Sequence, residues 1–558
     1  MTDSERVREL QKHIAFLLNI RTPWATAWQD IKEVVRPVRG FSISSLVPRD
    51  MTVEDLIPSK VVDNKAARAL RMLVAGLYSG LTPQSRPWFA LRLEDEELME
   101  YGPVKNWLYQ VQQILYGAFA RSNFYSSIFA MYFDLAPFCS GCMSMETRSG
   151  LGLRFQDIPI GSFAWGADSD GNIHTLARHL SIPARELVRR YGENKVHPST
   201  AETAKKDPYK GVDVIYAVMP RAYSDREPGK IDRRSKPFAS YLFEHESNHL
   251  VDEGGFDSFP FLCARWDVLG GEIYGRGSGF EVLPDVRNLQ SVSRDQSMAI
   301  RMSVTPPMKL PASLKGEPIY LIPGAKNYVS EQQAERIGPM FELKADIAAA
   351  SAKIAELHQA IREGYFNDLF LMLAGTDKAM TAFEVDQRNA EKMLMLGPVV
   401  SRHQIDILDP AISSTYTALF NMGGIPPVPE EIAGADLSID FLSVLAQAQR
   451  LPEANSIRKV VGDVAGMVQA NPESMAQDKI DYDQAVDELA NIEGVPPKII
   501  RTDDTVANIR RQRAEAQQQQ QRMQMLMEAG KQTNEAVRAM GGARGLAELA
   551  GRGGSGNA

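Results

Sequence analysis

Apolar residues recur at helical spacing through the first part of the chain. Leu10 and Ile14 begin one such stripe, and the ranges 66–77 and 104–119 carry two more. Spacings of three and four residues place apolar side chains on one face of a helix, so each range is predicted to be helical. Residues 85–91 break the pattern with a proline, whose preceding residue avoids the helical region. They are predicted to be extended.

The pattern of apolar and polar residues changes between residues 135 and 275. Short apolar runs at 153–155, 214–218 and 241–243 are separated by Gly, Asp, Asn and Pro. This alternation of short runs and turn residues is typical of strands and hairpins. A single helix is expected near 181–191, because Pro183 suits a helix start and Gly192 follows its end.

Two long helices with a compact stretch between them are predicted from residue 280 onward. The first begins at Pro284 and ends before the prolines at 306 and 307. The stretch 309–329 is rich in Pro, Gly and Lys, and Ser330 with Gln333 has the spacing of a capping box. An apolar stripe that reaches Tyr365 then indicates the second helix.

The remainder of the chain is predicted to be mostly helical. After a loop near 373–378, a second capping box opens a helix of about 40 residues, which Pro398 and Pro410 should kink. Further helices are expected from 435, and the end, 531–558, is expected to be disordered because it is rich in Gly and low in complexity. The fold class is therefore α+β and mainly helical.

Composition and charge limit the function. The chain has 558 residues, or three to four units at about 150 residues per domain. Its formal charge is −8, with 62 Lys and Arg against 70 Asp and Glu. A protein that grips nucleic acid through a broad basic face usually has the opposite balance. The arginines at 510–513 beside a glutamine run suggest either a nucleic-acid arm or a solvated helix with a frayed end, and the second is favoured.

The termini and the cysteines indicate a reducing compartment. The N-terminus lacks the basic and apolar regions of a secretory signal, so no signal is expected. No apolar stretch approaches the ~20 residues that span a bilayer, so no membrane association is expected. Three cysteines, Cys139, Cys142 and Cys263, do not suggest a disulfide framework.

His245, Glu246 and His249 match the H-E-x-x-H pattern of zinc hydrolases. That pattern binds zinc on a helix, where positions i and i+4 share one face. Here the flanking residues are strand-like, and Ser247 and Asn248 suit a turn. An exposed polar turn is the favoured interpretation, and the zinc hydrolase is kept as an alternative.

Two further patterns resemble sites without completing them. Cys139 and Cys142 form a lone CxxC without a second ligand pair, so a tight turn of small residues is favoured over a metal or redox site. Residues 275–279 read GRGSG, which lacks the dinucleotide spacing and suits a turn into a helix. The chain has no P-loop motif, so it is not expected to be a P-loop motor.

The order of several segments resembles the portal proteins, or head-to-tail connectors, of short-tailed, podovirus-type bacteriophages. The similar segments, in chain order, are LTPQSRPWF (81–89), PF (260–261), RWD (265–267), GEIYGRG (271–277), LPDVRNL (283–289), MTAFEV (380–385), LGPV (396–399), DYDQAV (481–486) and GVPPK (494–498). The resemblance covers roughly residues 5–525. One departure is at 138–142, where the family more usually has a Gly-Thr-Gly type turn.

The resemblance implies the portal fold: a ring, commonly of about twelve subunits, with an axial channel at the unique capsid vertex. Its expected divisions are a wing (1–280), a first stem helix (281–304), a clip (305–330), a second stem helix (331–366), a tunnel loop (367–380), a kinked wing helix (381–434), a helical crown region (435–530) and the tail (531–558).

The implied function is to package and eject double-stranded DNA through the ring, without sequence specificity. Expected partners are further copies of the chain, the terminase, the tail adaptor, and the major capsid and scaffolding proteins. The expected location is the portal vertex of the virion, and the host cytoplasm during assembly. No enzymatic activity, cofactor or metal is expected, because a separate terminase ATPase would supply the energy. Another structural ring protein of the virion is a second alternative.

An acidic or mixed channel wall lets DNA slide, because it adsorbs the phosphates weakly. The charge of −8 therefore suits a conduit, although it argues against a protein that grips DNA. A few cations can still centre the duplex. Candidates are Lys378, with Asp377 beside it, in the tunnel loop, and Lys309, Lys315 and Lys326 in the clip, where they would contact DNA, terminase or adaptor.

Overall fold

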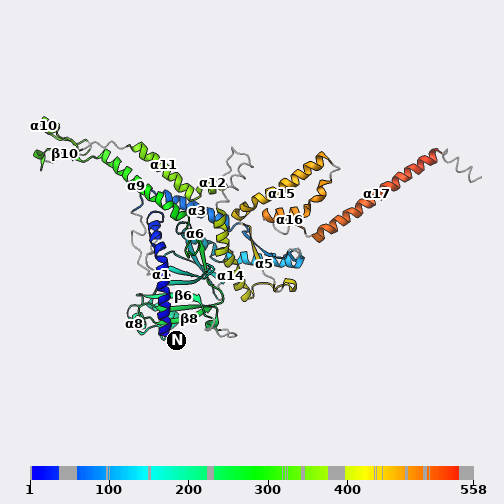
Figure 1. Ribbon diagram of the computed structural model, residues 1–558, viewed down its shortest axis with the longest axis horizontal. Helices are drawn as coiled ribbons and strands as arrows, with labels where there is room; N and C mark the ends of the chain where they lie inside the picture. The colour runs from blue at the N-terminus through cyan, green and yellow to red at the C-terminus, as the bar shows by residue number, and fades with distance from the viewer. Residues whose placement is uncertain are drawn as a thin grey trace, which may run out of the picture.

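The structure is a computed structural model. It describes residues 3–36, 60–95, 98–99, 101–148, 152–222, 232–316, 318–320, 322, 324–340, 346–374, 396–432, 434, 437–442, 444–471, 475–493, 499–501 and 503–539. Figure 1 shows a central body of helices and sheets, from which a helix pair and a long C-terminal helix project in different directions.

A five-stranded antiparallel sheet forms one end of the body, in the order β4-β5-β6-β7-β8. The strands are β4 (Phe163–Ala167), β5 (Ile173–Pro183), β6 (Gly211–Pro220), β7 (Phe238–Glu244) and β8 (Leu250–Phe256). The predicted strand region is thereby confirmed. The helix expected after Pro183 is α7 (Ala184–Tyr191), and α8 (Pro198–Lys206), which the sequence reading did not predict, follows it.

Each face of this sheet is covered by helices. Helix α1 (Asp3–Val34) packs Val7, Leu10 and Ile14 against one face, where it meets Ile215 of β6. Helices α7 and α8 cover the opposite face, where Val214 points. Because neighbouring residues of a strand face opposite ways, β6 contributes apolar side chains to both layers.

A second, three-stranded sheet lies at the centre of the body, in the order β3-β2-β9. Its strands are β2 (Ser140–Arg148), β3 (Gly152–Ile158) and β9 (Phe261–Arg265), and helix α6 (Phe124–Phe138) packs on it. Helices α3 (Lys65–Leu81) and α5 (Gly102–Arg121) complete the main core. Trp88, fully buried, stacks on Phe124 at 6.1 Å between ring centroids.

The C-terminal part of the chain returns to this body. The segment predicted to be extended at 85–91 overlaps β1 (Phe89–Leu93), which pairs antiparallel with β12 (Leu437–Phe441). The region from 435 is therefore not wholly helical, because it begins with a strand. Helices α15 (Val444–Ala470), α16 (Tyr482–Glu493) and α17 (Asp503–Ala539) follow.

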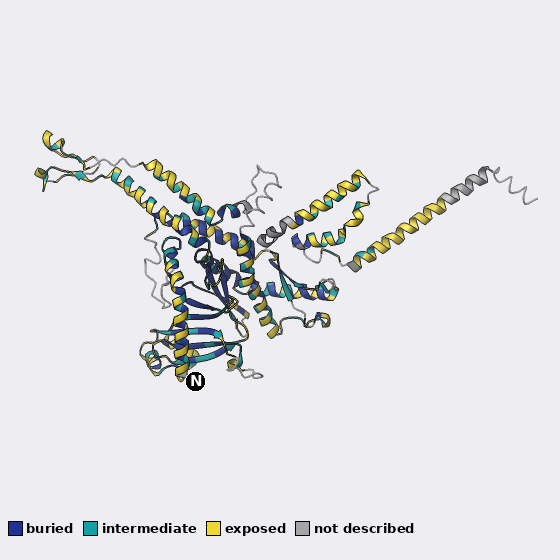
Figure 2. Cartoon of the chain, viewed as in Figure 1, coloured by how far each residue is buried: buried dark blue, intermediate teal, exposed yellow. Residues whose placement is uncertain are grey.

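Helix α17 differs from the sequence expectation at its end. It continues to Ala539, whereas disorder was expected from 531; residues 540–558 lie outside the described part. The side chains of 505–527 are mostly exposed, as expected for a solvated helix (Figure 2). Arg510 forms a two-point ion pair with Asp483 of α16, at 2.6 and 2.7 Å, so one arginine of the basic cluster is engaged within the chain.

A kinked helix was expected around Pro398 and Pro410. Residues 396–403 are helical, a π-helical turn follows at Gln404–Leu408, and α14 (Asp409–Asn421) continues the element. Pro410 has no N–H to donate, and a π-turn directly before it changes the hydrogen-bond pattern from i→i−4 to i→i−5. The start of the expected helix, 381–395, lies outside the described residues.

His403 makes the folded body sensitive to acid. Burial lowers the pKa of His403 to about 4, and the ring lies between Tyr132 and Trp266. The unfolded chain therefore binds this proton near pH 6.5 while the folded chain does not, and stability falls as pH drops from about 6.5 towards 4. The loss is expected to reach about 3 kcal/mol.

Thermal unfolding of the full-length protein between pH 4 and 7 measures this effect. His403→Phe, which keeps a ring in the site, is expected to flatten the pH dependence. The control His245→Gln changes an exposed ring and should leave the pH dependence as it is. An equal pH dependence in His403→Phe and the unsubstituted protein would contradict the assignment.

Candidate functional site

The projecting helix pair consists of α9 (Ser278–Val304) and α11 (Ile347–Gly364), which pack against each other (Figure 1). The two predicted helices are present, but their ends differ from the expected ones. Helix α9 begins at Ser278 and contains Pro284 in its interior. Helix α11 begins at Ile347, capped by the side chain of Asp346, which accepts from Ala349 N at 2.8 Å, and not at 331.

The pair is buried at its root and exposed at its tip (Figure 2). Val286 and Leu289 of α9 and Ile361 of α11 are fully buried in the main core. Farther out, Met298 is 54% and Val304 75% exposed. Where exposed apolar side chains form a contiguous patch, that surface is typically covered by another protein.

Residues 305–340, called here the intervening module, connect the two helices. Strands β10 (Met308–Lys309) and β11 (Gly338–Pro339) pair antiparallel and close it at its base. The capping box at Ser330 and Gln333 is confirmed, but it begins the four-residue helix α10 (Glu331–Ala334) and not the long helix. The side chain of Asn327 bridges the backbone N and O of Tyr320, at 2.9 and 2.8 Å.

The three lysines predicted as contact residues all lie in this module with exposed side chains. Lys309 is in β10, Lys315 follows a short 3₁₀ turn (Ala312–Leu314), and Lys326 precedes the bridging Asn327. None of them forms an ion pair with a carboxylate in the described part of the chain. Their charges are therefore available to a partner.

The intervening module also contains exposed apolar side chains. They are Leu310, Tyr320, Ile322, Tyr328 and Met340. Tyr328 is 93% exposed, which leaves an aromatic ring almost wholly in water. Aromatic side chains and methionine are enriched at the core of protein interfaces, and charged side chains such as lysine suit the polar rim.

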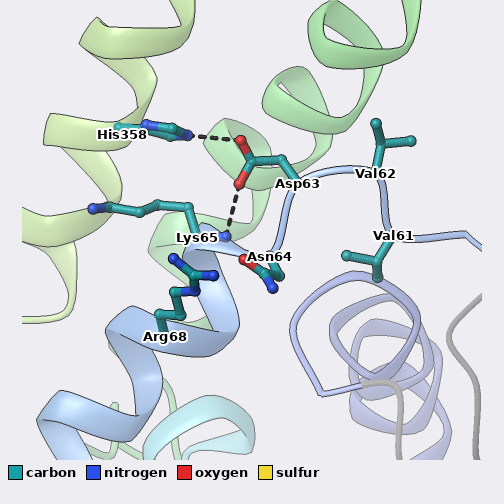
Figure 3. A pocket seen from close by; sticks show the side chains of 7 residues that line it. All are labelled: Val61, Val62, Asp63, Asn64, Lys65, Arg68 and His358. Carbon is teal, nitrogen blue, oxygen red and sulfur yellow. Dashed lines mark hydrogen bonds and ion pairs between the residues drawn. The ribbon is translucent and has the colours of Figure 1, made fainter. Parts of the chain in front are cut away.

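The root of the helix pair is joined to α3 by polar contacts that the sequence did not reveal. Gln290 of α9 is buried, and its Oε1 accepts from Val62 N at 2.8 Å and Asp63 N at 3.0 Å. Its Nε2 donates to Asp63 O at 2.6 Å. His358 of α11 places Nε2 2.8 Å from Asp63 Oδ2 (Figure 3). The short segment before α3 therefore holds both long helices.

A cavity of about 500 Å³ lies beside this junction. Figure 3 shows its lining, which is Val61, Val62, Asp63, Asn64, Lys65, Arg68 and His358. Asp63 is already bonded to His358 and to Lys65 N, so its carboxylate serves to fix the junction.

The predicted tunnel loop is described only at its start. Helix α12 (Asn367–Ala374) occupies the beginning of the range 367–380. Lys378 and Asp377 lie outside the described residues.

The H-E-x-x-H residues occupy the turn between β7 and β8, as the turn interpretation predicted. Asn248 has φ 54°, a left-handed conformation that a helix interior does not contain. The two rings face different neighbours. The ring centroid of His245 lies 5.1 Å from that of His179, and the ring centroid of His249 lies 5.8 Å from that of His197. No cluster of potential metal ligands occurs among the described residues. The zinc hydrolase is not supported.

The CxxC and GRGSG segments meet each other, but neither is the simple turn that was expected: residues 140–142 begin strand β2, and residues 278–279 begin α9. Cys139 ends α6 with φ 56°. A Cβ on Gly279 would lie 1.7 Å from Pro137 O, and one on Gly275 2.0 Å from Cys139 O. The glycines therefore allow the start of α9 to approach the carbonyl end of α6 closely. Their role is close packing of two helices, and not the flexible turn that was expected.

Comparisons with known proteins agree with the architecture. A family model described as "Bacteriophage head to tail connecting protein" matches residues 7–500. The chain is 35% identical over 503 residues to the probable portal protein of Bordetella phage BPP-1, covering 89% of each chain. It is 34% identical over 533 residues to the portal protein of Salmonella phage epsilon15, covering 94% of each chain.

A more distant relative extends the comparison. The portal protein of Enterobacteria phage T3 is 21% identical over 426 residues, which cover 71% of this chain and 73% of the relative. No described helix is long and apolar enough to cross a bilayer. The resemblance seen in the ordered segments is confirmed, and the chain belongs to the bacteriophage head to tail connecting protein family.

Proposed function

We propose that the chain is a portal protein, whose copies form a ring at the unique capsid vertex for the passage of double-stranded DNA. The observation that carries the proposal is the helix pair α9 and α11 with the intervening module at its tip, in a chain of the connector family. The relatives of similar length are named portal proteins. The ring would have about twelve subunits.

The exposed apolar side chains support assembly with further copies. Met298 and Val304 near the tip of α9 and Ile347 at the start of α11 are exposed in the single chain. Covering about 100 Å² of apolar surface contributes about 2.5 kcal/mol, so a ring that covers these residues in every subunit is favoured. Assembly into closed symmetric rings is common when one surface of a chain binds a different surface of the next.

The parts of the chain take roles in this ring. The body with residues 1–277 and 396–421 forms the wing, and α9 and α11 form the stem. We expect the clip at 305–330, and the pairing of β10 with β11 supports including the whole intervening module in it. Terminase and later the tail adaptor dock on the clip. The region after β12 forms the crown, which faces the capsid interior. The major capsid and scaffolding proteins contact the outside of the ring. The assembly forms in the host cytoplasm.

The net negative charge of the chain supports the passage of DNA without tight binding. A net charge of −8 in each subunit repels the DNA backbone, so the duplex slides without deep electrostatic traps. The protein would act without enzymatic activity, since the terminase hydrolyses the nucleotide.

Electron microscopy of the purified full-length protein tests the proposal. Rings of about twelve subunits with an axial hole are expected. A compact monomer under all conditions of salt and concentration would overturn it. A ring without an axial hole would favour the alternative of another structural protein of the virion.

Charge reversal in the tunnel loop is expected to impair packaging. Lys378→Glu places a negative charge where we propose that a cation centres the duplex, with Asp377 beside it. Packaging efficiency should fall severalfold while rings still form, measured as protected DNA per particle. The control Lys210→Glu reverses an exposed charge in the wing. Packaged DNA of unchanged length and amount in Lys378→Glu would contradict this role.

Charge reversal in the clip is expected to weaken docking. Replacing Lys309, Lys315 and Lys326 together with glutamate should reduce terminase binding to purified rings severalfold, most strongly at low salt. The matched control reverses three wing lysines, Lys205, Lys206 and Lys210. Equal terminase binding by the two triple variants would show that the clip lysines do not contribute.

A further inference from the structure

Cys142 and Cys263 face each other on neighbouring strands of the central sheet. Residue 142 of β2 is the register partner of residue 263 of β9, although 121 residues separate them in the chain. Their Sγ atoms are 3.9 Å apart. The pair that the sequence emphasised, Cys139 with Cys142, is therefore not the pair that the fold brings together.

The hydrogen-bond pattern places this pair at a position suited to a disulfide. Two inter-strand bonds, each 3.0 Å, fix the phase of the ladder: Trp266 N to Cys139 O and Met145 N to Pro260 O. Hydrogen-bonded and non-hydrogen-bonded pairs alternate in an antiparallel ladder, so Cys142 and Cys263 form a non-hydrogen-bonded pair. Such pairs have Cα atoms about 4.5 Å apart, within the range that a disulfide spans.

The third cysteine lies elsewhere. Cys139 ends α6, and its thiol is next to the backbone of Gly279 and Phe280 at the start of α9. Cys139 precedes β2, so it lies outside the paired residues of β2 and β9 that hold Cys142 and Cys263. Cys139 does not compete for either partner.

The two thiols are protected but unequal in exposure. Both residues are buried, and Cys263, at 6% exposed, is the less enclosed of the two. Burial raises the pKa of Cys263 well above its usual value, which keeps the thiol protonated and its oxidation slow.

We propose that Cys142 and Cys263 are an oxidation site, at which a peroxide converts the two thiols into a disulfide between β2 and β9. The Cys263 sulfur first attacks hydrogen peroxide, whose O–O bond breaks, giving a sulfenic acid and water. The Cys142 sulfur then attacks the sulfenic sulfur, forming the S–S bond and releasing a second water. Both thiol protons leave in the water, and the two electrons reduce the peroxide.

The bond would fasten the centre of the body. It closes a loop of about 120 residues, and a disulfide that closes a long loop restricts the unfolded chain strongly. If the chain is a portal protein, as proposed above, the bond forms after the particle leaves the reducing host cytoplasm. The chemistry itself does not depend on the ring.

Thiol mapping of the full-length protein tests the proposal. Protein purified with reductant is freed of it, treated with hydrogen peroxide while folded, unfolded, alkylated and digested without reduction. Mass spectrometry should find one peptide pair linked through residues 142 and 263, with only Cys139 alkylated. The linked form should also have a higher thermal midpoint than the reduced protein.

Two variants sharpen the result. Cys139→Ala should still form the link, and Cys263→Ala should keep both remaining thiols after peroxide. Alkylation of all three cysteines in the treated protein would overturn the proposal, as would a link between residues 139 and 142 or terminal oxidation of Cys263 with Cys142 still free. A monomer that forms the link would leave this proposal intact and overturn only the portal assignment.

Discussion

Replacing Arg265 with methionine is expected to destabilise the protein by about 3–5 kcal/mol, because it leaves a carboxylate buried without its partner. Arg265 ends β9, and its Nε and Nη2 donate to the two oxygens of Asp406 at 2.9 and 3.1 Å. The two side chains are 4% and 6% exposed. A third bond, from Nη1 to Gly171 O at 2.8 Å, ties in the turn between β4 and β5.

The thermal midpoint and soluble yield of the full-length protein measure this loss. The double variant Arg265→Met, Asp406→Leu removes both charges and should recover most of the stability, since an apolar pair can replace a buried ion pair. The control Arg276→Met breaks a pair with Glu272 in which the arginine side chain is 55% exposed, and it should cost less than about 1 kcal/mol. An Arg265→Met protein with the midpoint of the unsubstituted protein would contradict the prediction.

Replacing Gly279 with alanine is also expected to destabilise the protein, in this case through the backbone. The new Cβ would lie 1.7 Å from Pro137 O, and backbone atoms cannot rotate away as a flexible side chain can. The start of α9 would have to move from α6, breaking the bond from Ser278 Oγ to Ala136 O (3.1 Å). Overpacking of this kind costs about 1–3 kcal/mol or more.

Limited proteolysis together with soluble yield reports this displacement, since cleavage near the start of α9 should increase. Gly270→Ala is the matched control, because a Cβ there meets nothing within 4 Å. It should behave as the unsubstituted protein does. If Gly279→Ala is as protease-resistant as Gly270→Ala, the close approach of the two helices is not required.

Local patterns predicted the elements better than their ends. The apolar stripes located both long helices, because a helix that is buried on one side has an apolar residue at every third or fourth position. Ser330 and Gln333 do form their capping box, yet a cap specifies only the first turn and does not determine the length of the helix. The long helix instead begins after Asp346, whose cap lacks the partner glutamate or glutamine.

Contacts between distant segments could not be predicted. Strand β12 has the alternating sequence LSIDF, which is a strand pattern that the mostly helical prediction from 435 overlooked, but the sequence does not indicate its pairing with the distant β1. Gln290, Asp63 and His358 meet across 227 and 295 residues, and nothing near any of them marks the others. Lys309, Lys315 and Lys326 are exposed in the intervening module, and their contact with a partner stays a prediction.

Helix α9 is a continuous rod from the core of the body to the intervening module. Its 27 residues span about 40 Å at 1.5 Å per residue. Its root is fixed against α6 by backbone contact and against the segment before α3 by Gln290. A tilt of about 5° at that root would move the tip by roughly 3–4 Å over this length. The helix therefore acts as a lever: a force on the intervening module produces a torque at Gly279 and at Gly275 just before the helix, where the chain contacts the end of α6.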